Sequence, residues 1–218
     1  SGARQGTAVV EGLSVDLNSV MGDFTFAIQH LDRSLSISRE LGYRKGVAKA
    51  VNTLGDIYYL QKQHDISLMY YDQAIEIARS TNNRLVLGSS LEEKGRVLLA
   101  DGQLEALRAT ETEALAIAED LGNPELLIGV RLLHALALAA YDPLNTEEAL
   151  LQVEAILVGS DISDEHRADS SLTRFQISGG IDDEARETAL DYYEALYAET
   201  PKFVYNYYLS ILRGEREL

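Results

Sequence analysis

Apolar residues recur at intervals of three and four along the chain, which is the spacing of one face of an α-helix. The clearest runs lie within residues 47–58 and 66–77, on either side of a short polar break. Their apolar members are Val47, Val51, Leu54 and Tyr58, then Ile66, Tyr70, Ala74 and Ile77. No alternating strand pattern with hairpin signals accompanies them, so the pattern predicts an all-α protein.

The same pattern returns after 40 residues: residues 54–83 align with residues 94–123, with Gly55 on Gly95 and Ala74 on Ala114. Three positions of one helix can be followed through the chain. They are Ala27, Ser67, Leu107, Ala149 and Ala189, then Leu31, Tyr71, Glu111, Val153 and Tyr193, then Ser34, Ala74, Ala114, Ile156 and Leu196. The intervals are 40, 40, 42 and 40, and we place the two extra residues in the turn 142–145.

Five units of two helices follow from this period, at about residues 7–42, 43–82, 83–122, 123–160 and 161–199. A last helix is expected at 201–213, after Pro201. One helix pair buries too little apolar surface to be stable alone, so the units must stack. The sequence therefore predicts a single repeat domain over residues 1–218.

Turn and capping residues stand at the expected boundaries. Gly42, Asn82 and Gly122 are placed where a helix ends in the left-handed conformation. Two further turns, Gly22-Asp23 and Asp101-Gly102, separate the helices of a pair. The expected helix N-caps are Asn123, Asn145, Ser163 and Asp182.

The residues Leu54, Gly55 and Tyr58, followed by Ser67, Tyr71 and Ala74, resemble the signature of the tetratricopeptide repeat family. The family's usual unit has about 34 residues. The longer unit of this chain is similar to those of bacterial transcription activators, signalling enzymes and eukaryotic spindle-orientation adaptors. The resemblance extends over residues 7–199, with departures at Leu107, Glu111 and Ala135. It implies a right-handed α-solenoid of five antiparallel helix pairs with a C-terminal capping helix.

In that family, the first helices of the units line a concave groove that binds peptides. The matching positions are Lys49, Asn52, Asp56, Tyr59, Ser89, Glu92, Arg96, Leu99, Gly129, Leu132 and Leu136. The same side chains could instead be solvated or paired within the chain, for example Arg96 with Asp56. One family subtype clamps terminal carboxylates, and Asp56 disfavours it here because its charge would repel them.

Tyrosines are concentrated at the C-terminal end, where residues 192–208 contain six of the twelve. The last helix could cover the open end of the fifth unit with these rings. Alternatively, it could form a docking or homodimer surface. The residues of that surface would be Tyr197, Phe203, Tyr205, Tyr207 and Tyr208.

Charge and composition exclude several classes of partner and of chemistry. The net charge of −16 disfavours nucleic acid and anionic membranes as partners. No cysteine is present, and we expect no apolar run to approach the ~18 residues needed to span a bilayer. The four histidines lack metal-ligand spacing, and no nucleophile or phosphate-binding motif occurs. We therefore expect a cytoplasmic protein with no enzymatic activity, metal or cofactor.

The predicted function is binding of a protein or peptide, as a scaffold or regulatory part of a larger signalling protein. Two alternatives are carried with it. One is a ligand-sensing domain that switches an attached output domain, and the other is homodimerisation through the tyrosine-rich helices.

Overall fold

The computed structural model describes residues 24–158 and 162–216, and the described part of the chain is helical without strands. Its elements are α2 (Phe24–Glu40), α3 (Arg44–Leu60), α4 (His64–Ser80), α5 (Arg84–Ala100), α6 (Leu104–Leu121), α7 (Pro124–Tyr141), the 3-10 turn η1 (Pro143–Asn145), α8 (Thr146–Leu157), α9 (Asp164–Ile177), α10 (Asp183–Glu199) and α11 (Phe203–Leu212). The predicted all-α class is confirmed. The first helix of the first unit and the Gly22-Asp23 turn lie outside the described residues.

Helix boundaries reproduce the period read from the sequence. The helices α2, α4 and α6 begin at Phe24, His64 and Leu104, which are 40 residues apart. The helices α3, α5, α7 and α9 begin at residues 44, 84, 124 and 164, with the same interval. The extra residues before α8 form the turn η1, where the insertion was predicted.

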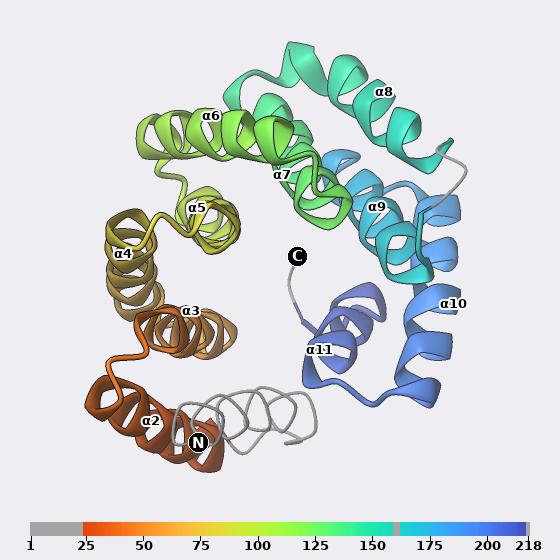
Figure 1. Cartoon of the computed structure of the whole chain (residues 1–218). Helices are drawn as coiled ribbons and strands as arrows, with labels where there is room; N and C mark the ends of the chain where they lie inside the picture. The colour runs from red at the N-terminus through yellow and green to blue at the C-terminus, as the bar shows by residue number, and fades with distance from the viewer. Residues whose placement is uncertain (1–23, 159–161, 217–218) are drawn as a thin grey trace. The chain divides into compact units, whose positions relative to one another are not determined.

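Two compact units divide the chain, one ending at Leu127 and the other beginning at Ile128, and each is described by itself. In the N-terminal unit, turns of two or three residues join consecutive helices, which forces neighbours to run antiparallel. The helices α3 and α5 form one face of this unit, and α2, α4 and α6 form the other (Figure 1).

A close crossing of α3 and α4 shows why small residues recur at the repeated positions. The Tyr71 ring is fully buried, and a Cβ added at Gly55 would lie 2.7 Å from it. The Ser67 hydroxyl donates a 2.8 Å hydrogen bond to the Gly55 carbonyl from the facing helix. Only a residue without a side chain leaves room for both contacts, so Gly55 sets the distance between the two helices.

The left-handed turn residues were predicted correctly. Gly42, Asn82 and Gly122 have φ angles of 65°, 50° and 58°. At each of these turns, backbone N–H groups donate to carbonyls of the helix that has just ended. The left-handed turn residues therefore recur with the same 40-residue period as the apolar positions.

Three of the four predicted N-caps are confirmed. The side chains of Asn123, Ser163 and Asp182 accept hydrogen bonds from the backbone three residues on, at 2.9, 3.2 and 3.0 Å. The prediction for Asn145 is wrong, because its side-chain amide turns back to donate to the Leu138 carbonyl at 3.3 Å. Asp142 caps the 3-10 turn instead, accepting from the Leu144 N–H at 2.9 Å.

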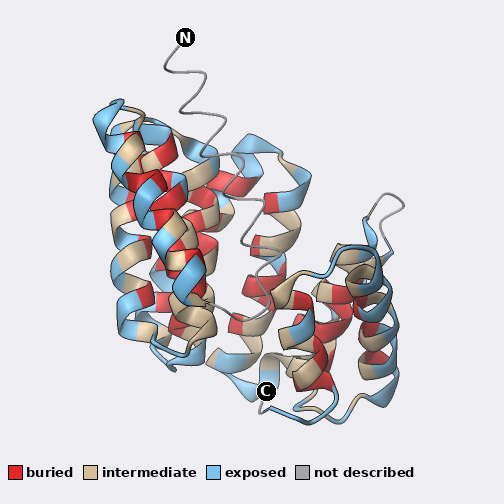
Figure 2. Cartoon of the chain, turned by 90° about the horizontal axis from the view of Figure 1, so that it is seen from below, coloured by how far each residue is buried: buried red, intermediate tan, exposed pale blue. Residues whose placement is uncertain are grey.

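The C-terminal unit contains two apolar clusters. One joins α7 and α8 and contains Leu132, Ala135, Ala149, Val153 and Ile156. The other joins α9, α10 and α11 and contains Ala168, Leu172, Phe175, Ala185, Ala189, Tyr193, Tyr205, Leu209 and Leu212. Figure 2 shows the buried residues on the helix faces that meet and the exposed ones on the outer faces.

Helix α7 is long and apolar enough, by length and composition alone, to cross a membrane. This corrects the expectation that no segment of the chain meets that criterion. A core helix of a soluble protein passes the same test, and Leu132 and Ala135 pack in the core of the C-terminal unit. Glu125 and Arg131 also interrupt the apolar surface of the helix.

We expect Gly55→Ala to lower the free energy of unfolding by about 1–3 kcal/mol, because the added methyl group overlaps the buried Tyr71 ring. Urea denaturation would measure the loss. In a Tyr71→Leu background the overlap is relieved, so the same glycine substitution should cost much less. An equal loss in both backgrounds would contradict this account of the crossing.

Candidate functional site

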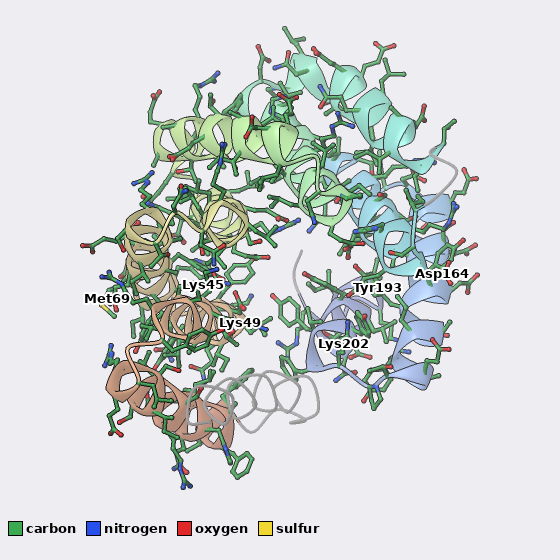
Figure 3. The ribbon with its side chains drawn as sticks, in the orientation of Figure 1. Lys45, Lys49, Met69, Asp164, Tyr193 and Lys202 are labelled. Carbon is green, nitrogen blue, oxygen red and sulfur yellow. The ribbon has the colours of Figure 1, made fainter. Side chains whose placement is uncertain are left out.

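The α3–α5 face of the N-terminal unit carries most of the predicted groove residues. Lys49 on α3 is exposed. Asn52, Asp56 and Tyr59 follow it towards the C-terminal end of the helix, and each of them is partly buried. Figure 3 shows Lys45 and Lys49 on one side of the unit and Met69 of α4 on the opposite side. The face is therefore polar, with cations at its N-terminal end.

Residues of α5, the first helix of the next repeat, contact these α3 side chains. The Ser90 hydroxyl donates to Asn52 Oδ1 at 2.6 Å, so it links the two helices. Ser89 instead bonds to its own helix, at the Leu85 carbonyl. Because Asn52 Oδ1 already accepts from Ser90, the amide N–H groups of Asn52 are the part of the side chain suited to bind a ligand carbonyl.

Asp56 lies among other acidic groups. Burial and the charge of Glu93, with a smaller contribution from Glu92, raise its pKa to about 8, although a hydrogen bond from Tyr71 acts in the opposite direction. That bond joins the Tyr71 hydroxyl to Asp56 Oδ1 at 2.7 Å. Burial, followed by the charges of Asp56 and Glu93, also raises the pKa of Tyr71. At neutral pH, Asp56 is therefore predominantly a neutral carboxyl.

Arg96 is paired within its own helix. Its guanidinium lies 3.0 Å from Glu92 Oε1, one turn earlier. The sequence had suggested Asp56 as an internal partner, and the carboxylate placed beside Arg96 here is Glu92, which is almost fully buried. The pair and Leu99, which is partly buried, complete the α5 part of the face.

The remaining predicted groove residues belong to the C-terminal unit. Leu132 is only 1% exposed and packs in the core with Ala149 and Val153, so its side chain is not available to a ligand. This placement differs from the predicted groove position, because α8 covers that side of α7. Leu136 and Gly129 are partly buried.

The tyrosine-rich end forms much of the core of its own unit. Tyr205 is 3% exposed, and its ring lies 5.9 Å from that of Tyr193. The Tyr205 hydroxyl donates to Glu165 at 2.8 Å, and Lys202 also reaches that carboxylate, at 3.1 Å. Tyr205 therefore faces inward, as expected if the last helix covers the end of the fifth unit, and it is not available as a docking residue, which was the alternative. The partly buried members of that set are Tyr197, Phe203, Tyr207 and Tyr208.

Groups that could hold a metal were sought among the described residues, and no cluster of three or more His, Asp or Glu side chains was found there. His64 contacts Asp101, and its ring lies 5.6 Å from that of Tyr59. This contact joins the ends of two helix pairs.

Three residues of the site were missed from the sequence. Lys45 lies one turn before Lys49, so helical spacing alone could have identified it. Ser90 and Glu93 act across the helix pairs, on Asn52 and Asp56 respectively. Intervals within one helix carry no signal for contacts of that kind.

Comparison with known proteins agrees with the fold. Residues 7–80 match the model of the tetratricopeptide repeat family. No curated protein matches the chain by sequence. The resemblance predicted from the residues is confirmed over the matched segment.

Solved structures extend the agreement in fold to most of the chain. BtubC (BKLC) from P. vanneervenii is similar with a TM-score of 0.66 and 15% identity, over 89% of this chain and 83% of that one. A putative kinesin light chain with TPR-like repeats from Podosopora anserina is similar with a TM-score of 0.58 and 19% identity, over 92% of this chain and 98% of that one. The α-solenoid of stacked helix pairs is thus confirmed.

The raised pKa of Asp56 predicts a pH-dependent stability. Below about pH 4 both the folded and the unfolded chain hold the proton, and no penalty arises. As the pH rises towards 8 only the unfolded chain releases it, so folding becomes less favourable. Asp56→Asn removes this titration and keeps an acceptor for Tyr71. We expect it to stabilise the protein by about 1–3 kcal/mol at pH 8 and to have little effect at pH 4.

Thermal unfolding between pH 4 and pH 9 would measure the difference. Glu76→Gln is the matched control, because Glu76 is exposed on α4. A difference between Asp56→Asn and the original protein that does not change with pH would show that Asp56 is ionised in the folded state.

Proposed function

We propose that the chain is a protein-binding scaffold and that the α3–α5 face of its N-terminal unit binds an extended or helical segment of a partner. The family matched by residues 7–80 consists generally of protein-interaction scaffolds. The polar, partly exposed side chains of α3 and α5 support this use of the face. We place the scaffold in a larger signalling protein, on the basis of its 40-residue units.

The single observation that carries the proposal is the pair Lys45 and Lys49. Both are exposed on α3, one turn apart, and neither forms an ion pair with another of the described residues. Several other cations of the unit are paired, as Arg79 is with Glu113 and Lys94 with Asp72. In a chain of net charge −16, two adjacent cations of this kind favour a segment with acidic residues.

The other end of the face has the opposite preference. Glu92 and Glu93 already raise the pKa of Asp56, and a ligand carboxylate placed there would meet the same repulsion. A carboxylate clamp centred on Asp56 therefore stays disfavoured. The bound segment should direct its acidic residues towards Lys45 and its backbone carbonyls or cationic groups towards Asp56.

We expect peptides selected from a random display library against the whole chain to be enriched in Asp and Glu. The double substitution Lys45→Glu with Lys49→Glu should weaken the selected peptides roughly tenfold, because each reversal costs up to about 1 kcal/mol at an exposed site and about 1.4 kcal/mol corresponds to a factor of ten. Fluorescence anisotropy at low salt would measure the affinity.

The matched control reverses two exposed cations elsewhere in the same unit, Arg33→Glu with Lys62→Glu, and leaves the net charge equal to that of the test variant. Equal weakening by both variants would mean that only the overall charge matters. Selection of peptides without acidic enrichment would remove this face from consideration.

A further inference from the structure

The N-terminal unit has an open cavity on the face formed by α2, α4 and α6. Its volume is about 140 Å³, and it lies between α4, α5 and α6. The lining residues are Asp72, Ile75, Arg79, Leu91, Lys94, Ala109, Thr110 and Glu113. Ile75 and Leu91 are buried and form the apolar floor, whereas the four charged side chains are partly exposed and surround the opening.

The 40-residue period assigns each lining residue a counterpart one unit earlier. The counterparts are Asp32, Leu35, Arg39, Val51, Leu54, Met69, Tyr70 and Gln73. Two differences are large: Thr110 stands where the preceding groove has Tyr70, and Lys94 stands where it has Leu54. The chain therefore contains two equivalent grooves, one with an aromatic ring and one without it.

In the earlier groove, Tyr70 fills the space between α2 and α4. It packs against the cluster that contains Leu35, Val51 and Leu54. Its ring also stacks on Tyr58, with 5.3 Å between centroids and 7° between planes. The counterparts of Leu35 and Val51 are Ile75 and Leu91, the floor of the cavity, so this part of the apolar support is kept while the ring itself is missing.

The surroundings of the Tyr70 hydroxyl are also repeated. Burial, followed by Tyr58 and Asp32, raises the pKa of Tyr70, and Arg39 acts against this, which places both charged residues near the ring. Their counterparts Asp72 and Arg79 lie at the opening of the cavity. There each has a partner: Asp72 accepts from Lys94 at 2.7 Å, and Arg79 donates to Glu113 at 2.7 and 2.8 Å.

We propose that the cavity between α4, α5 and α6 binds a para-hydroxyphenyl group, the side chain of a tyrosine on a partner protein, in the place that Tyr70 occupies one unit earlier. The volume is close to that of an enclosed aliphatic cavity of about 150 Å³ that binds benzene, and here the cavity is open on its charged side. The charged opening distinguishes a phenol from a purely apolar ring, because its hydroxyl can both donate to a carboxylate and accept from a cation.

The test uses p-cresol, which is the tyrosine side chain as a free molecule, and toluene, which lacks only the hydroxyl. Amide chemical shifts of the whole chain are followed by NMR during titration. We expect saturable shifts at residues lining the cavity, with a dissociation constant of the order of 1 mM for p-cresol, as befits so small a ligand. Toluene should bind at least threefold more weakly.

Thr110→Tyr supplies the missing ring from the chain itself and should weaken p-cresol binding at least tenfold. The matched control is Thr112→Tyr, which adds the same ring on the exposed side of α6 and should leave binding unchanged. The reciprocal change, Tyr70→Thr, should create a second site and raise the number of bound p-cresol molecules from one to two. It tests the proposal separately if Thr110→Tyr fails to fold.

Three outcomes would overturn the proposal. They are the absence of saturable shifts up to about ten times the expected dissociation constant, unchanged binding in folded Thr110→Tyr, and equal affinity for toluene and p-cresol. The last would show that the charged opening contributes nothing to recognition.

Discussion

The close approach of the two helices of a pair is the constraint on which the rest of the N-terminal unit depends. At the crossing of α3 and α4, Gly55 leaves room for the Tyr71 ring, and Ser67 bonds directly to the Gly55 carbonyl. The distance between the helices then determines which side chains can fill the space beside them. The repeat returns small residues to the position of Ser67, and Ala27, Ala149 and Ala189 are buried there like Ser67, whereas the third unit has the larger Leu107.

The buried Tyr71 also has an electrostatic consequence. Its hydroxyl must find a partner inside the unit, and it finds Asp56 on the facing helix. This places a carboxyl close to Glu92 and Glu93, where burial and like charges hold it mostly neutral at physiological pH. A packing requirement thereby shapes the chemistry of the face proposed to bind a partner, because it separates an acidic end from the Lys45–Lys49 end.

Individual substitutions within the repeat then diversify its surfaces. Between the second and third pairs, Tyr70 is replaced by Thr110 and Leu54 by Lys94, which exchanges a filled groove for a cavity with a charged opening. The helix boundaries keep their 40-residue interval through this exchange. A repeat architecture tolerates such changes because each unit contacts only its neighbours, so a loss of packing stays local.

Several contacts of the candidate site could not be predicted from the sequence. Lys49, Asn52 and Asp56 were predicted to share a face from the groove positions of the tetratricopeptide repeat family, and they do. The bond from Ser90 to Asn52 and the effect of Glu93 on Asp56 were not predicted. Each of these depends on the distance between side chains of different helices, which differs from one crossing to the next.

The sequence by itself determined the helical class, the 40-residue interval, the left-handed turns at Gly42, Asn82 and Gly122, and three of the four N-caps. These features are local, or they repeat a local feature, so the spacing of apolar residues and the conformational freedom of glycine and asparagine are sufficient to specify them. Only the tertiary structure decided that Leu132 is a core residue, that Arg96 pairs with Glu92, and that Thr110 leaves a cavity. Packing volumes and the burial of charge are properties of several helices together, and no periodicity along one helix encodes them.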